Sequence, residues 1–240
     1  MDKPLITRWH HDSFGDFALE VNKLIHIYPK TDLDLYDLRG IVFGALNMRR
    51  NIEKQAFVET DFSFCDFSNC NLLNVSFTNC RFERCKFPDL RQWGTVYEYC
   101  TFLKSSFQNA TLGTGCSYKN CVFEASDLKG KYFNFGLNTN FKNVSFINCK
   151  IQSAQICSVT FEDCIFQSQF KSVRFTGRKF AEVFYENDRI SYPTTLRDCQ
   201  FSGSKFDQVE VFYDIEQTRV IWPDAHPIDF NEDRWYYDEE

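Results

Sequence analysis

Cysteine and histidine are the residues of this chain best suited to chemistry, through disulfides, metal ligation or nucleophilic attack. The sequence holds eleven Cys and four His in 240 residues. A zinc site needs close pairs such as Cys-x2-Cys. The cysteines are spaced instead in fives, as in Cys65/Cys70, Cys80/Cys85 and Cys116/Cys121. The adjacent His10 and His11 have only Asp12 as a further ligand nearby. We therefore expect no metal site and no cofactor.

Catalytic motifs do not accompany these residues. The sequence contains no Gly-rich phosphate loop, no nucleophile elbow and no pair of zinc-protease histidines. The N-terminal stretch MDKPLITRWHHDSF lacks the apolar run of a signal peptide, and no segment approaches the ~18 apolar residues of a membrane span. We expect a cytoplasmic protein that is not an enzyme, has no catalytic residues and contacts no membrane. Its thiols should stay reduced, with a Cys65–Cys85 disulfide as the open alternative.

The charge is divided unevenly along the chain. The formal net charge is -6, but residues 207–240 alone carry -9 and the preceding 206 residues carry +3. A weakly basic body is far from the dense basic patches that phosphate contacts require, so direct nucleic-acid binding is disfavoured.

The cysteine spacing belongs to a five-residue repeat of large apolar residues. In the stretch FVETDFSFCDFSNCNLLNVSFTNCRFERCKF, from Phe57 to Phe87, every fifth residue is Phe or Leu. Twenty of the 27 Phe fall at such centres, and Gln92 is the polar exception. A period of five fits neither the helix period of 3.6 nor the strand period of two. The chain must therefore turn a corner after every unit.

Small residues stand two positions before the centres, and ten of the eleven Cys are among them. Residues two apart in extended backbone face the same side, so each small residue should enter the interior with its large partner. We interpret these cysteines as buried packing residues. Cys157 falls just after a centre and should face outward. In this register Phe133 is a centre, and three extra residues are inserted around Gly136.

Units such as Thr60–Phe64 (TDFSF) and Cys65–Asn69 (CDFSN) resemble the pentapeptide-repeat family, whose motif is Ala-(Asp/Asn)-Leu-x-x. The resemblance covers roughly residues 31–212. It implies an all-β solenoid, a right-handed quadrilateral β-helix of four pentapeptides per coil, with about nine coils in a rod roughly 40 Å long. The sequence departs from the motif by preferring Phe at the centres and Cys or Thr before them.

A coil of twenty residues predicts which side chains stack. Asp61 should lie beside Arg81, and Asp66 beside Lys86, with both pairs facing outward. Inward columns should form from Phe62, Phe82 and Phe102 and from Phe67, Phe87 and Phe107.

The two ends of the solenoid need covers, because open sheet edges promote association. We assign residues 1–30 to an N-terminal capping segment, with a short helix over 14–26 that begins at a capping box formed by Ser13 and Asp16. Residues 31–212 form the β-helix. Residues 213–240 form an acidic, aromatic C-terminal segment, read either as an irregular cap or as a tail that binds a partner or forms a dimer.

Three segments interrupt the repeat and are the candidate binding loops: 88–99, 133–141 and 185–196. The candidate partner-binding residues are Arg91, Trp93, Tyr99, Trp235, Tyr236 and Tyr237, of types enriched in binding hot spots. Packing of Trp93 against a neighbouring coil is the alternative.

A rod without a pocket is typical of proteins that bind through extended surfaces. We therefore expect a non-enzymatic scaffold that binds a protein partner, as a monomer or as a homodimer through the C-terminal end. The resemblance implies an alternative: a DNA mimic that binds DNA gyrase or another type II topoisomerase and protects it from quinolones or toxins. That role needs stripes of acidic residues, whereas the coils are net positive. Fold alone does not identify the partner.

Overall fold

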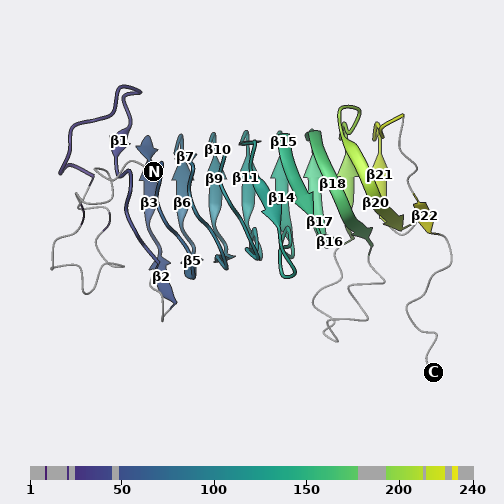
Figure 1. Cartoon of the computed structure of the whole chain (residues 1–240), viewed down its shortest axis with the longest axis horizontal. Helices are drawn as coiled ribbons and strands as arrows, with labels where there is room; N and C mark the ends of the chain where they lie inside the picture. Colours follow the sequence, from purple (N-terminus) through teal and green to yellow (C-terminus); the bar gives the residue numbers. More distant parts are fainter. Residues whose placement is uncertain are drawn as a thin grey trace.

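The chain forms a rod of stacked β-coils (Figure 1). The computed structural model describes residues 9, 21, 25–44, 49–177, 193–212, 215–224 and 229–231. Every strand pairing in this part of the chain is parallel, and each strand pairs with the equivalent strand of the next coil. The predicted all-β solenoid is therefore confirmed.

Three parallel sheets run along the rod. In spatial order the largest contains β1 (Tyr36–Asp37), β4 (Thr60–Asp61), β7 (Arg81–Glu83), β10 (Thr101–Leu103), β12 (Val122–Glu124), β15 (Ser145–Gln152), β18 (Ile165–Thr176), β20 (Lys205–Phe212) and β22 (Asp229–Asn231). Two further strands join it through β15 and β18, namely β13 (Asp127–Lys129) and β16 (Gln155–Cys157).

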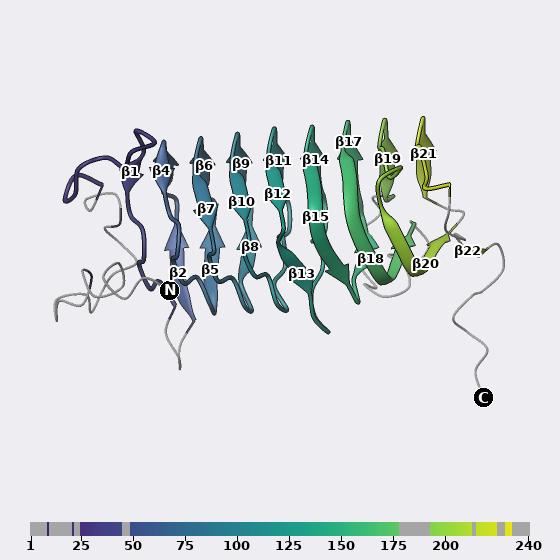
Figure 2. The ribbon, with the colours of Figure 1, turned by 45° about the horizontal axis from the view of Figure 1, so that its top comes forward.

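The second sheet contains β3 (Ala56–Val58), β6 (Ser76–Thr78), β9 (Val96–Glu98), β11 (Ser117–Lys119), β14 (Thr139–Lys142), β17 (Val159–Glu162), β19 (Thr195–Arg197) and β21 (Glu216–Thr218). Figure 2 shows most of these strands side by side along its upper edge. The third sheet contains β2 (Arg50–Glu53), β5 (Cys70–Leu73) and β8 (Arg91–Trp93).

The corners of the coils explain the five-residue period. A residue in the left-handed region follows most centres by two positions, as at Lys54, Glu59, Phe64 and Asn69. Four such corners fall in one coil, which makes the solenoid four-sided. Asn, Asp and Gly tolerate this conformation best, which accounts for the many Asn at these positions.

The interior is a set of aromatic columns. The rings of Phe62 and Phe82 stack with centroids 5.2 Å apart, and Phe102 continues the column at 4.9 Å. Phe67 and Phe87 stack at 5.1 Å in the neighbouring column. All of these side chains are buried, so the predicted inward columns are confirmed.

The small inward residues do more than pack. All eleven Cys are free and buried. The Cys85 Sγ donates to the carbonyl oxygen of Phe62 in the preceding coil at 3.0 Å, and the Cys65 Sγ to that of Leu38 at 3.1 Å. Ser105 makes the same bond through its hydroxyl, to the carbonyl oxygen of Phe82 at 3.0 Å. These thiols are therefore weak hydrogen-bond donors between coils as well as apolar fillers.

Gln92, the polar centre, belongs to a buried hydrogen-bond network. Its Nε2 donates to the Tyr118 hydroxyl at 3.1 Å and to the Thr111 carbonyl at 3.3 Å. The Tyr97 hydroxyl donates to Gln92 Oε1 at 2.7 Å, and the Tyr118 hydroxyl donates to the Leu112 carbonyl at 3.1 Å. Two tyrosines at centre positions therefore require one polar side chain among them, because buried hydroxyls need partners.

The number of coils differs from the prediction. The structure has about eight turns rather than about nine. In the second sheet Phe161 of β17 lies beside Leu196 of β19. These two residues are 35 positions apart in the sequence, whereas a regular coil takes about twenty. The interval between them therefore contributes one coil rather than two.

One register assignment and one expected exposure also need correction. Asn134 is bridged to Thr111, which precedes the centre Leu112, so the matching centre is Phe135 and not Phe133. Phe133 and Phe135 are both buried, with their rings 5.4 Å apart. Two of the three extra residues therefore lie before Phe133, at Lys131 and Tyr132. Cys157, predicted to face outward, is only 6% exposed.

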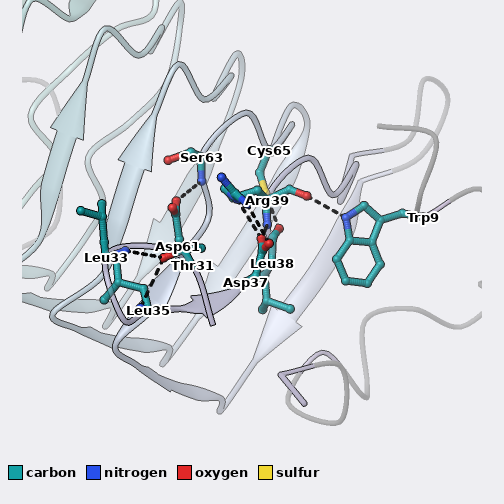
Figure 3. A network of polar contacts seen from close by, with 10 residues as sticks. All are labelled: Trp9, Thr31, Leu33, Leu35, Asp37, Leu38, Arg39, Asp61, Ser63 and Cys65. Carbon is teal, nitrogen blue, oxygen red and sulfur yellow. Dashed lines mark hydrogen bonds and ion pairs between the residues drawn. The ribbon is translucent and has the colours of Figure 1, made fainter. Parts of the chain in front are cut away.

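The N-terminal end of the rod carries a polar cluster (Figure 3). Asp37 and Asp61 lie side by side in β1 and β4, and Arg39 binds the Asp37 carboxylate through Nε at 3.0 Å and Nη2 at 2.9 Å. Asp61 accepts a hydrogen bond from the Ser63 amide at 2.8 Å and is 3% exposed. Asp61 does lie beside Arg81, as predicted, but it is buried because β1 packs against it.

The predicted helix over residues 14–26 is not supported. Most of it lies outside the described residues, and Ile25–Ile27 form a turn. Trp9 and Val21 belong to the buried core, and Trp9 Nε1 donates to the Arg39 carbonyl at 2.7 Å.

Beyond residue 212, β21 and β22 continue the second and the largest sheets. Among the described residues, no helix is both long enough and apolar enough to span a bilayer.

Candidate partner-binding groove

A hollow of about 550 Å³ lies on the side of the rod that carries β5 and β8. Figure 1 shows this side along its lower edge, from β2 and β5 to β16. The hollow is lined by Asp89 and Arg91 of segment 88–99 and by Asn134 and Leu137 of segment 133–141. The fold thus brings two of the three predicted binding loops to one surface. The third, 185–196, lies mostly outside the described residues.

One wall of the hollow is formed by the extra residues Lys131 and Tyr132. They follow Gly130, whose φ is 123°, in the left-handed region. A Cβ at Gly130 would lie 2.8 Å from the Asn109 amide nitrogen, so this turn needs glycine. The turn directs Tyr132 away from the core, with 64% of its surface exposed, and the Lys131 Nζ lies 5.2 Å from the Tyr132 ring centroid.

The floor of the hollow is a ladder of uncharged polar side chains. Thr111, Asn134 and Gln155 are bridged in successive coils. The Thr111 hydroxyl donates to Asn134 Oδ1 at 2.7 Å, and that oxygen also accepts from the Gly136 amide at 2.9 Å. These bonds fix the Asn134 amide in one orientation. The Gln155 side chain forms no hydrogen bond with any described residue.

A second hollow of about 510 Å³ extends the first along the rod. Ser153 and Gln155 line both hollows, and the second ends at Arg174 and Glu210, whose side chains form an ion pair at 2.8 Å. We call the two hollows together the groove. Because its members come from successive coils, the groove runs parallel to the rod axis.

Three cations project into the groove without a carboxylate partner. Arg49, Arg91 and Lys131 form no ion pair with any described residue. Arg49 donates instead to the Asp89 carbonyl at 2.9 Å. On the other sides most cations are neutralised, as in Lys86–Asp66 at 3.6 Å, Lys119–Glu98 at 3.0 Å and Lys142–Glu162 at 2.7 Å. The first of these pairs was predicted from the sequence.

The predicted binding residues do not all meet in the groove. Arg91 lines it, and Trp93, 40% exposed, is bridged to the lining residue Thr114. Tyr99 is 54% exposed but lies at the corner after β9, away from the groove. The other three, Trp235, Tyr236 and Tyr237, lie outside the described residues. Sequence reasoning missed Arg49, Lys131 and Tyr132; the two surplus residues after Gly130 were the available signal.

The chemistry of the lining favours binding. Cys157 is the thiol that lines the groove, and it is buried. Elsewhere in the rod, burial raises the pKa of Cys70 to about 12 and that of Cys116 and Cys149 to about 11. Protonated, buried thiols are poor nucleophiles. Within the described part of the chain, no three His, Cys, Asp or Glu side chains are grouped so that they could hold a metal ion.

Comparison with sequence families gives one partial match. A family model described as the SV2A/B/C luminal domain matches residues 43–128, about a third of the chain. No curated protein sequence matches the chain.

The chain is also similar to several solved structures. Trypsin-treated QnrB1, a plasmid-mediated fluoroquinolone resistance protein, is 16% identical; the alignment covers 73% of this chain and 90% of QnrB1, with a TM-score of 0.33. HetL, a pentapeptide-repeat protein involved in heterocyst differentiation regulation in the cyanobacterium Nostoc sp. strain PCC 7120, is 10% identical, with coverage of 79% and 92% and a TM-score of 0.32. Rfr23 from the cyanobacterium Cyanothece 51142 is 10% identical, with coverage of 78% and 90% and a TM-score of 0.17.

Proposed function

Because the chain is a solenoid of pentapeptide repeats, we propose that it acts as a non-enzymatic scaffold that binds a protein partner along the groove. The observation that carries this proposal is the convergence of unpaired Arg49, Arg91 and Lys131 with exposed Tyr132 in one hollow. Arg and Tyr are among the residues that dominate binding energies at protein interfaces. Most side chains that line the groove stand on stacked, hydrogen-bonded coils, so little ordering is needed on binding.

A single neutral substitution tests the role of the groove. Gln155→Trp fills the junction of the two hollows without changing the charge or removing a hydrogen bond to a described residue. Gln169→Trp is the matched control, since Gln169 is an exposed position of β18 outside both hollows. Immobilised wild type, Gln155→Trp and Gln169→Trp are compared by cross-linked capture from cell extract. A partner of the groove is retained by wild type and by the control and lost from Gln155→Trp. If Gln155→Trp retains every specifically captured protein, the groove is not the binding surface.

Protection of a type II topoisomerase is the finer proposal that the resemblance suggests, and the charges argue against it. A DNA mimic needs continuous negative stripes. On the second sheet Glu98 pairs with Lys119, and Glu162 pairs with Lys142. We therefore expect the protein to leave quinolone inhibition of gyrase supercoiling unchanged; rescue of supercoiling would favour the mimic instead.

We further propose a reducing, cytoplasmic location, because the eleven thiols are unpaired and buried. The C-terminal end remains the proposed dimer contact. Sedimentation analysis of the full chain distinguishes monomer from dimer, and mass determination with and without reductant detects any disulfide.

A further inference from the structure

We propose that the groove recognises an extended segment of a protein partner that is rich in Asp and Glu. This inference rests on the proposed function and adds the chemistry of the segment that is bound. The three unpaired cations of the groove are the anchors for its carboxylates.

The distribution of charge along the rod supports an anionic ligand. Arg49, Arg91 and Lys131 come from different coils, and among the described residues Asp89 is the one carboxylate that lines the larger hollow. Most described cations elsewhere are neutralised within the rod, by partners such as Asp207 for Lys171 and Asp198 for Arg219. Positive charge that the protein leaves uncompensated in a concave surface attracts and orients an anion more strongly than charge on a flat face does. Guanidinium groups also suit carboxylates because they form two parallel hydrogen bonds with them.

The shape of the groove favours an extended segment over a compact ion. Its two hollows follow the rod axis from Arg49 to Glu210, and they are connected at Ser153 and Gln155. Neighbouring coils are about 4.8 Å apart, so successive layers offer polar groups at regular intervals. The Gln155 amide, which forms no hydrogen bond with a described residue, can donate to or accept from a peptide backbone. A single phosphate or sulfate would contact only a small part of this surface.

The flanking aromatic residues supply a second element of recognition. Tyr132 is 64% exposed on one wall, and Trp93, 40% exposed, stands beside Thr114 of the lining. A segment that contains both acidic and aromatic residues therefore offers carboxylates to the cations and aromatic rings to Tyr132 or Trp93.

Nucleic acid is the less suitable polyanion. A duplex would need several phosphate contacts in a row. Beyond the larger hollow, the next cation along the groove, Arg174, is already paired with Glu210. The groove offers three cations and a ladder of amide and hydroxyl groups, which match a peptide better than a phosphate backbone.

The test uses charge reversal with a control of equal charge. Arg91→Glu with Lys131→Glu reverses two groove cations. Lys104→Glu with Lys205→Glu changes the net charge equally at two exposed positions outside the groove, and neither lysine forms an ion pair with a described residue. The probe is a fluorescein-labelled synthetic peptide of about eight residues with alternating Glu and Tyr. A second probe has Gln in place of every Glu.

Fluorescence anisotropy on the full chain measures binding at low and moderate salt. We expect the Glu peptide to bind wild type, the groove variant to lose at least about tenfold in affinity, and the control variant to change by less than about twofold. The Gln peptide should bind at least about tenfold more weakly, and salt should weaken binding of the Glu peptide. Circular dichroism is used to check that both variants are folded.

Three results would overturn the inference: equal loss in both variants, equal binding of the Glu and Gln peptides, or no binding of the Glu peptide to wild type. Preferential binding of a labelled DNA duplex, lost in the groove variant, would also overturn it. These outcomes are separate from the capture experiment. If Gln155→Trp loses a captured partner while the charge-reversal variant retains it, the groove binds a protein but not through an acidic segment.

Discussion

Gln92 offers the sharpest test of how the interior is built, because it is the polar side chain at a centre position of the aromatic core. It accepts from the Tyr97 hydroxyl at 2.7 Å and donates to the Tyr118 hydroxyl at 3.1 Å. Gln92→Leu restores the apolar repeat pattern with a side chain of similar volume, so it leaves little cavity. If the repeat pattern alone governed stability, this substitution would stabilise the protein.

The structure predicts the opposite. In Gln92→Leu the Tyr97 hydroxyl keeps no hydrogen-bond partner among the described residues, and the Tyr97 side chain is only 2% exposed. The cost of leaving one buried hydroxyl unpaired is about 1–3 kcal/mol. The Thr111 carbonyl also loses the donor that lies 3.3 Å away, which adds about 0.5–1.5 kcal/mol. Tyr118 retains its bond to the Leu112 carbonyl. We therefore expect a loss of about 2–3 kcal/mol in the free energy of unfolding.

The measurement is equilibrium urea unfolding followed by circular dichroism. The control is the triple variant Gln92→Leu, Tyr97→Phe and Tyr118→Phe, in which the polar groups are removed together. Its stability should return to within about 1 kcal/mol of wild type, because replacing all partners by apolar groups leaves little unpaired. The reasoning fails if Gln92→Leu is neutral or stabilising, or if the triple variant is no more stable than Gln92→Leu.

Further expectations concern the corners, the thiols and the phenols. Tyr99→Asn should raise the free energy of unfolding by about 0.5–1 kcal/mol, because Tyr99 has a φ of 54° and Asn tolerates this conformation better than Tyr. Asn79→Tyr, at the stacked corner with a φ of 53°, should lower the free energy of unfolding by a similar amount. Urea unfolding in which both variants shift the stability in the same direction would contradict this. Cys85→Ser should keep the hydrogen bond to the Phe62 carbonyl of the preceding coil, whereas Cys85→Val loses it. In thermal or urea unfolding the free energy of unfolding of Cys85→Val should therefore be about 1 kcal/mol lower than that of Cys85→Ser. No thiol should react with iodoacetamide before unfolding, and rapid native labelling detected by mass spectrometry would refute their burial. Burial raises the pKa of Tyr97 and Tyr118 above the ordinary value of ~10. The stability that these two phenols contribute is therefore complete below pH ~10 and is lost as the pH rises through their higher folded pKa. The tyrosinate absorbance of both residues should appear only when the protein unfolds.

The repeat made the fold predictable to an unusual degree. A Phe every fifth residue with a small residue two positions earlier could be satisfied only by a chain that turns after each inward pair. The stacking of Phe62 on Phe82 and the pairing of Asp66 with Lys86 follow from that geometry. Where insertions break the period, the sequence offers no phase reference, so the prediction erred at Phe133. Cys157 follows a centre whose register is kept, but it is buried in the floor of the groove.

The candidate groove was only partly foreseeable. Arg91 and Trp93 stood out by residue type, but Arg49 and Lys131 are about forty residues to either side of Arg91 and belong to no common motif. The sequence also suggested an exposed Asp61, which packing of β1 makes buried. Side-chain neighbours in other coils decide such burial.

By itself the sequence determined the period, the inward columns, the choice of small residues before each centre and the uneven charge, because each of these is local or repeats at a fixed interval. Only the tertiary structure decided that a polar Gln92 pairs two buried tyrosines, that thiols donate to carbonyls of the preceding coil, and that three cations meet in one groove without an ion pair to any described residue. The physical reason is that most of these contacts join different coils, and their partners depend on the exact number of residues in each turn of the solenoid.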